Sequence, residues 1–248
     1  MIISTNAIVL KTIRYGDSSI ISRLYTETHG KIVVMAKGVW KPKNTTGPIM
    51  EPMNHIHLHY YDKSSREIQI LKNASLISQF SLLRSNLEKI ILGQIVVESL
   101  DKSTSANNPM PILYRLVWRV LEKMNFANVN FWMIYSFYLY QLAVRLGFMP
   151  NLTSCHQCQS ILTKAFIDDY LGELICHDCN TQSKLTLDNK SLIFLQNMEK
   201  MHLDDIENKI NAFPEIENAL YFLKKFNFTH MEGMDKVRSL DMIQKLLN

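Results

Sequence analysis

The segment Asn6–Gly38, "NAIVLKTIRYGDSSIISRLYTETHGKIVVMAKG", decides how the first third of this chain folds. Apolar and polar residues alternate in three short runs, and many of the apolar residues are β-branched. The turn-forming sequences "YGDS" and "THG" separate these runs. Alternation with a period of two, interrupted by such turns, predicts three β-strands.

Two more alternating runs follow, "HIHLHYYD" at residues 55–62 and "EIQILKNASLIS" at residues 67–78. Five short strands within the first 79 residues fit a small closed barrel. A five-stranded Greek-key barrel of this size is an OB-fold, which often binds single-stranded nucleic acid. The alternation alone fits an SH3-like barrel equally well.

From Leu82 onward the apolar residues recur with a helical period, which predicts a helical domain. Gly147 and Pro150 follow the run 130–146 and are typical helix stop signals. The expected fold class is therefore α+β, with a barrel at residues 1–79 and a helical domain at residues 80–248 that carries a metal-binding insert at 150–187. The expected helices cover residues 82–103, 112–124, 130–146, 187–201, 214–228 and 234–247.

One helical segment requires a test as a membrane span, because Met124–Val144 contains no charged residue. Several asparagine, serine and glutamine residues interrupt it, whereas a span needs about 20 mostly apolar residues. We therefore interpret it as a buried core helix. The N-terminal segment lacks the features of a signal peptide, and we expect no membrane partner.

All four cysteines lie in the segment 155–179, "CHQCQSILTKAFIDDYLGELICHDC". Two C-x2-C turns, separated by 17 residues, can present four thiolates to one ion. A redox dithiol pair or unliganded thiols fit two matched turns less well. Such a cluster in a chain without other cysteines indicates a reducing compartment. We expect one structural Zn²⁺ per chain, held by Cys155, Cys158, Cys176 and Cys179.

Histidines supply two alternative metal-binding patterns. His156 and His177 lie inside the cysteine turns and could replace a cysteine or bind nucleic acid, but solvated turn positions fit them better. His55, His57 and His59 alternate along one expected strand and therefore face the same way. Because this row contains no carboxylate, we interpret it as a partly exposed barrel face.

No motif in the chain indicates catalysis. The sequence contains no phosphate-binding G-x-x-x-x-G-K-[ST] or G-x-G-x-x-G motif and no G-x-S-x-G motif. A site with four cysteine ligands leaves no open position on the metal for substrate. We expect a binding protein that is not an enzyme and needs no nucleotide.

Positive charge is concentrated in the barrel. Residues 1–79 carry 10 Lys and Arg against 5 Asp and Glu, whereas residues 80–248 carry 17 against 18. Such local excess favours a polyanionic partner, although a solvated basic loop gives the same count. Lysines can neutralise phosphates and a tryptophan can stack on a base. The candidate nucleic-acid-binding residues are Arg14, Arg23, Lys31, Lys37, Trp40, Lys41 and Lys43.

At these residues the sequence resembles the bacterial RecO family of DNA repair proteins. The resemblance continues, in the same order, through most of the chain. The matching segments are "RYGDSSII" (14–21), "THGKIVVMAKGVWKPKN" (28–44), "EPM" (51–53), "RLGFMPNLTSCHQC" (145–158) and "HMEGMDKVRSLDMI" (230–243).

The resemblance implies an N-terminal OB-fold, a helical domain and, in many members, a zinc-binding element. It further implies binding of single- and double-stranded DNA, annealing of complementary strands and loading of RecA onto strands coated with single-stranded DNA-binding protein (SSB). RecR and the C-terminal tail of SSB are the implied protein partners, and a cytoplasmic location near the nucleoid is implied during repair.

One departure concerns the residues after "AKG", where family members are often more basic and this chain has Val39 and Trp40. DNA affinity could be lower here, or Trp40 could supply stacking instead. The alternative function is a zinc-containing OB-fold adaptor that acts mainly through protein partners, with a groove on the helical domain for a peptide.

Overall fold

The computed structural model covers the 248-residue chain and describes residues 1–239 except 40, 42–43, 127, 149, 169 and 209–212. The side chains of residues 207–208 and 213–216 are likewise not described.

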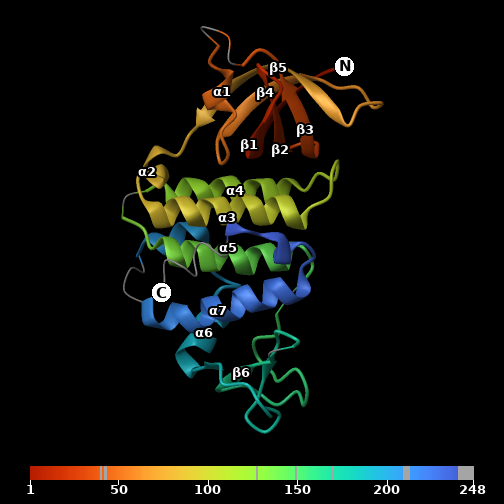
Figure 1. Ribbon diagram of the computed structural model, residues 1–248. Coiled ribbons are helices and arrows are strands. Elements are labelled where there is room, and N and C mark those ends of the chain that lie inside the picture. Colours follow the sequence, from red (N-terminus) through yellow and green to blue (C-terminus); the bar gives the residue numbers. More distant parts are fainter. Residues whose placement is uncertain are drawn as a thin grey trace. The chain divides into compact units, whose positions relative to one another are not determined.

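The first five strands form a closed barrel (Figure 1). Its hydrogen-bonded order is β1-β2-β3-β5-β4, with β4 returning to β1. All pairings are antiparallel except the parallel pairing of β3 with β5. The expected OB-fold is confirmed. The strands are β1 (Ile2–Tyr15), β2 (Ser19–Thr26), β3 (Gly30–Ala36), β4 (His55–Tyr61) and β5 (Ile68–Ser78).

Alternation separates the inside of the barrel from its outside. On β3, Ile32, Val34 and Ala36 point into the core, whereas the residues between them are half-buried. A β-bulge between Val9 and Lys11 adds one residue to β1. The alternation of inward and outward side chains on β1 therefore shifts by one position after the bulge.

Helices and a small sheet make up the rest of the described chain. Asn86, Asn130 and Asp188 cap three of the helices, because each side chain accepts a hydrogen bond from an amide three residues later. The helices are α1 (Thr46–Ile49), α2 (Ser81–Arg84), α3 (Leu87–Ser103), α4 (Pro111–Met124), α5 (Phe131–Arg145), α6 (Asn189–Asn197) and α7 (Phe213–His230). The 3-10 helices are η1 (Leu203–Asn208) and η2 (Met234–Lys236). The sheet consists of β6 (Ala165–Ile167), β7 (Leu174–Ile175) and β8 (Thr186–Leu187).

Helix α5 contains most of the uncharged segment Met124–Val144. It is buried along nearly its whole length, as expected of a core helix, and packs against α7 and η1. None of the described helices combines the length and hydrophobicity that a transmembrane segment requires.

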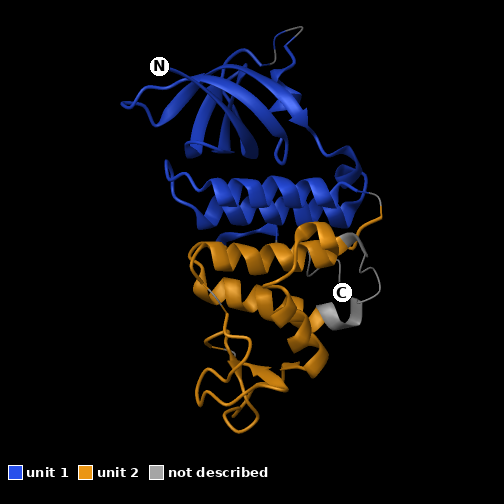
Figure 2. Cartoon of the chain, turned by 180° about the vertical axis from the view of Figure 1, so that it is seen from behind, with its two compact units in different colours: residues 1–126, 236–248 blue, residues 127–235 orange. Residues whose placement is uncertain are grey.

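The chain forms two compact units (Figure 2). Residues 1–126 and 236–248 make the first, and residues 127–235 make the second. The barrel and the helices that follow it fall in one unit because α3 and α4 pack against β1 of the barrel.

The end of the described chain is tied to α3 within the first unit. Both carboxylate oxygens of Glu98 accept hydrogen bonds from the segment that follows η2: the amide of Arg238 to one, and the amide and hydroxyl of Ser239 to the other. Most of the helix expected at 234–247 falls at residues 240–248, beyond the described chain.

Candidate functional site

The four cysteines form one cluster in the second unit. Their sulfur atoms all lie within 4.8 Å of one another, and those of Cys158 and Cys176 are 3.6 Å apart. Sulfurs bound tetrahedrally to zinc at about 2.3 Å lie about 3.8 Å from each other. The cluster therefore has the size of a four-cysteine metal centre, as the spacing predicts.

Local hydrogen bonds build this centre. The amide of Cys155 donates to the carbonyl of Ser160, which closes the first turn. Strands β6 and β7 pair antiparallel, with Phe166 opposite Ile175, and bring the second turn beside the first. The expected hairpin between the cysteine pairs is thus present, and β8 adds a third strand along β6.

The electrostatics of the cluster suit a cation. Burial favours the neutral thiol of Cys155, but amide hydrogen bonds from Cys158, Cys176 and Gln157 outweigh it and lower the pKa to about 6. The amide of Cys179 is the main cause that lowers the pKa of Cys176. Contacts with the Cys158 and Cys176 sulfurs raise the pKa of Cys179 to about 12. Four adjacent thiolates repel one another, and a divalent ion compensates that charge.

The histidines near the cluster lie outside the group of side chains placed to hold a metal. His156 is exposed, and the His177 side chain is 89% exposed with Nδ1 3.3 Å from Asp178. Within the described part of the chain, the cysteines are the one group of His, Cys, Asp or Glu placed to hold a metal. Four soft sulfur donors are typical of a closed structural site.

The histidine row on β4 does not converge on one point. His55 is buried, and its Nε2 lies 2.6 Å from the Tyr114 hydroxyl of α4. His57 instead bonds to Ser4 and Asn6 on β1. The row is therefore a packing surface, and its first member is more buried than expected.

The candidate DNA-binding residues divide into two groups. Lys37 and Lys41 are exposed beside the turn at Gly38, whose φ of 68° is in the left-handed region that glycine tolerates. Arg14 is exposed near the end of β1. Trp40 and Lys43 belong to the positions that the structure does not describe.

Arg23 and Lys31 form the second group and point towards α3. Arg23 Nη1 lies 2.9 Å from the carboxylate of Asp101, and Lys31 Nζ donates to the carbonyl oxygens of Asp101 and Thr104. The Lys31 side chain is only 14% exposed. Part of the positive charge counted in the sequence therefore compensates a buried acid.

The barrel strands themselves carry no acid. All five are described, and none contains Asp or Glu. The five acidic residues of this region, Asp17, Glu27, Glu51, Asp62 and Glu67, fall in loops. Asp101 of α3 offsets Arg23 and Lys31, but no strand sets a carboxylate beside the other cations of the barrel wall. The remaining positive charge favours a polyanionic partner.

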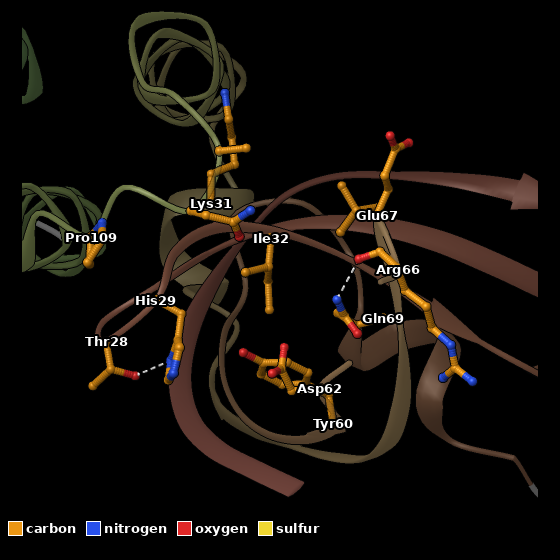
Figure 3. Close-up of a pocket in the computed structure, with 13 residues that line it drawn as sticks. Thr28, His29, Lys31, Ile32, Tyr60, Asp62, Arg66, Glu67, Gln69 and Pro109 are labelled. Carbon is orange, nitrogen blue, oxygen red and sulfur yellow. Dashed lines mark hydrogen bonds between the residues drawn. The ribbon is translucent and has the colours of Figure 1, made fainter. Parts of the chain in front are cut away.

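A cavity of about 260 Å³ lies at one end of the barrel (Figure 3). Asp62 and Glu67 line it together with Arg66, and Lys31 runs from it towards the helix. Because cations and carboxylates are balanced around it, this cavity is a poor site for phosphate.

Comparison with known families shows the family to which the chain belongs. Residues 1–80 match the family model "Recombination protein O N terminal", and residues 84–238 match "Recombination protein O C terminal". The chain belongs to the RecO family. Its OB-fold barrel and its cysteine cluster lie within the first and second RecO matches, respectively.

Individual relatives agree with this membership. A DNA repair protein RecO from Salinibacter ruber is 36% identical over 149 residues, which is 60% of this chain and 57% of that protein. One from Pelodictyon phaeoclathratiforme is 31% identical over 62% of this chain and 59% of its own length. One from Chloroherpeton thalassium is 26% identical over the full length of both chains. The first two matches thus span less than two thirds of those RecO proteins.

Proposed function

We propose that this RecO family protein binds single- and double-stranded DNA, anneals complementary strands and helps load RecA onto SSB-coated single strands. It does so without a nucleotide and without catalysing a covalent reaction. Family membership supports this proposal, and so does the absence of catalytic motifs from the sequence.

The observation that carries the proposal is the charge of the barrel. Exposed Lys37 and Lys41 lie beside strands that contain no carboxylate. We assign the first contact with DNA phosphates to these two lysines, with Arg14 nearby on β1. Trp40 and Lys43 remain predicted contacts, and Arg23 and Lys31 contribute less because Asp101 offsets their charge.

Annealing follows from phosphate neutralisation. Two complementary strands repel each other, and a basic surface that binds both lowers that repulsion. Phosphate contacts carry no sequence information, so binding tolerates any sequence and weakens with salt as counterions are released. Pairing edges that face away from the protein stay available to the second strand.

We propose that the cysteine cluster holds one structural Zn²⁺. Four sulfurs at the right spacing and a hairpin that brings them together support this assignment. The ion would supply a cross-link between two turns whose residues between the cysteines are exposed. Partners proposed from the family are RecR and the C-terminal tail of SSB.

The salt dependence of DNA binding tests the surface. Anisotropy titrations of a labelled single strand at several NaCl concentrations give the slope of the logarithm of the binding constant against the logarithm of the salt concentration. This slope should be smaller for Lys37→Ala/Lys41→Ala than for the wild type, by the amount expected for the loss of about two phosphate contacts. Lys164→Ala/Lys184→Ala in the cysteine-bearing region is the matched control. An unchanged slope would move the DNA site elsewhere, and no binding at all would favour the adaptor function.

A further inference from the structure

Apolar side chains form a continuous patch on the outside of the barrel. Strand pairing sets Ile13 of β1 opposite Ile21 of β2, Ile21 opposite Met35 of β3, and Met35 opposite Ile70 of β5. Val33 and Ile68 form a second pair beside this row. The apolar band consists of Ile13, Ile21, Val33, Met35, Ile68 and Ile70.

The band faces solvent. Ile13 is 50% exposed and Ile68 is 36% exposed, and the other four are partly exposed. Their neighbours on the same strands, such as Val34 and Gln69, are buried and point the other way. Exposed apolar residues in register across four strands are more than the scattered ones that any surface carries.

Exposed lysines border the band. Lys11 and Lys72 are each two residues from a band member on the same strand, Ile13 and Ile70 respectively, and side chains two residues apart on a strand point the same way. Lys37 follows directly after the end of β3, two residues beyond Met35, and all three lysines are exposed. No strand contributes a carboxylate to this surface.

We propose that the apolar band contacts the bases of a single strand while Lys11, Lys37 and Lys72 bind its phosphates. This inference rests on the proposed DNA-binding function and adds the group that distinguishes single strands from duplex. In a duplex the base faces are stacked within the helix and cannot reach the band, whereas phosphates are available in both forms.

The dimensions fit a short run of bases. Four adjacent strands about 4.8 Å apart span about 14 Å. Sheets in RNA-binding modules stack two or three bases on a comparable surface. Here the contacts are aliphatic, so the free energy comes from burial of apolar area on the base faces. The flanking lysines favour a nucleic acid over an apolar or basic peptide as the occupant.

The test compares Ile13→Thr/Ile70→Thr with the wild-type full chain. Threonine retains β-propensity, so the strands should persist, and thermal unfolding checks this. Ile77→Thr is the matched control, because Ile77 is also 50% exposed on β5 and lies outside the band. The probes are an oligothymidylate of about 15 nucleotides, a duplex of equal length and an abasic strand of equal length.

We expect the band variant to bind the oligothymidylate about fivefold or more weakly. Its salt slope, its duplex affinity and its affinity for the abasic strand should equal those of the wild type. Equal losses on single strand and duplex, or no loss on either, would overturn the band assignment while leaving DNA binding intact. A wild-type protein that binds none of the probes would refute the proposed function and the band together.

Discussion

The guanidinium of Arg23 on β2 lies 2.9 Å from the carboxylate of Asp101 on α3. Lys31 reaches the same carboxylate at 3.7 Å, and Asp101 is buried. One acid thus holds two cations of the barrel against the helix that packs on it. The contact joins parts of the chain that are far apart in sequence.

Asp101→Asn should destabilise the first unit by about 2–3 kcal/mol, because two cations lose their carboxylate partner. The loss is smaller than for a fully buried pair, since the Arg23 side chain is 36% exposed. Urea unfolding measures it. Glu122→Gln, which breaks the exposed pair with Arg119, should change stability by less than about 0.5 kcal/mol. Equal effects of the two changes would contradict the role of Asp101.

His55 makes stability depend on pH. Burial lowers the pKa of His55 to about 4, whereas an unfolded histidine titrates near 6.5. As the pH falls below 6.5, the unfolded state binds a proton at His55 that the folded state does not bind until about pH 4. The free energy of unfolding therefore decreases over this range. Between pH 7 and pH 5 this contributes about 2 kcal/mol. Urea unfolding of His55→Gln should show a smaller loss over this range; an equal loss would contradict this origin.

Metal removal should affect the two units differently. Elemental analysis of freshly purified protein should give one equivalent of zinc per chain. Chelation, or Cys158→Ser, should make the segment 155–179 sensitive to protease, because its two turns are largely exposed and lose the ion that joins them. DNA binding by the barrel should keep its salt slope. Substoichiometric metal, or a protease-resistant segment without it, would contradict a structural zinc.

Glu98→Gln should loosen the C-terminal segment. The carboxylate accepts hydrogen bonds from Arg238 and Ser239, and an amide cannot accept them all. Trypsin cleavage after Arg238, followed by mass spectrometry, should be about fivefold faster or more. Glu232→Gln at an exposed position is the control. Identical cleavage rates for the two variants would exclude Glu98 as the anchor.

The features that the sequence predicts correctly are those set by residues close together along the chain. Alternation identified the five strands, and two C-x2-C turns identified the cysteine cluster, because each pattern is local. The structure then grouped α3 and α4 with the barrel, a result of tertiary packing that periodicity does not encode.

Partners across long sequence separations could not be predicted in this way. Arg23 and Lys31 counted as candidate DNA contacts, since nothing near them in the sequence indicates Asp101. Asp101 lies among polar residues near the end of α3, so the local pattern does not mark it as buried. The apolar band was missed for the same reason, because register between strands becomes visible only in the folded barrel.

The most direct test of the central claim is annealing. Two complementary fluorescent oligonucleotides are mixed with the purified protein without nucleotide, first bare and then coated with SSB. The account predicts faster duplex formation in both cases, and a smaller acceleration with Lys37→Ala/Lys41→Ala. Acceleration of bare strands alone would leave DNA binding intact but contradict action on SSB-coated DNA. No acceleration in either case would contradict the account and favour an adaptor that acts through protein partners.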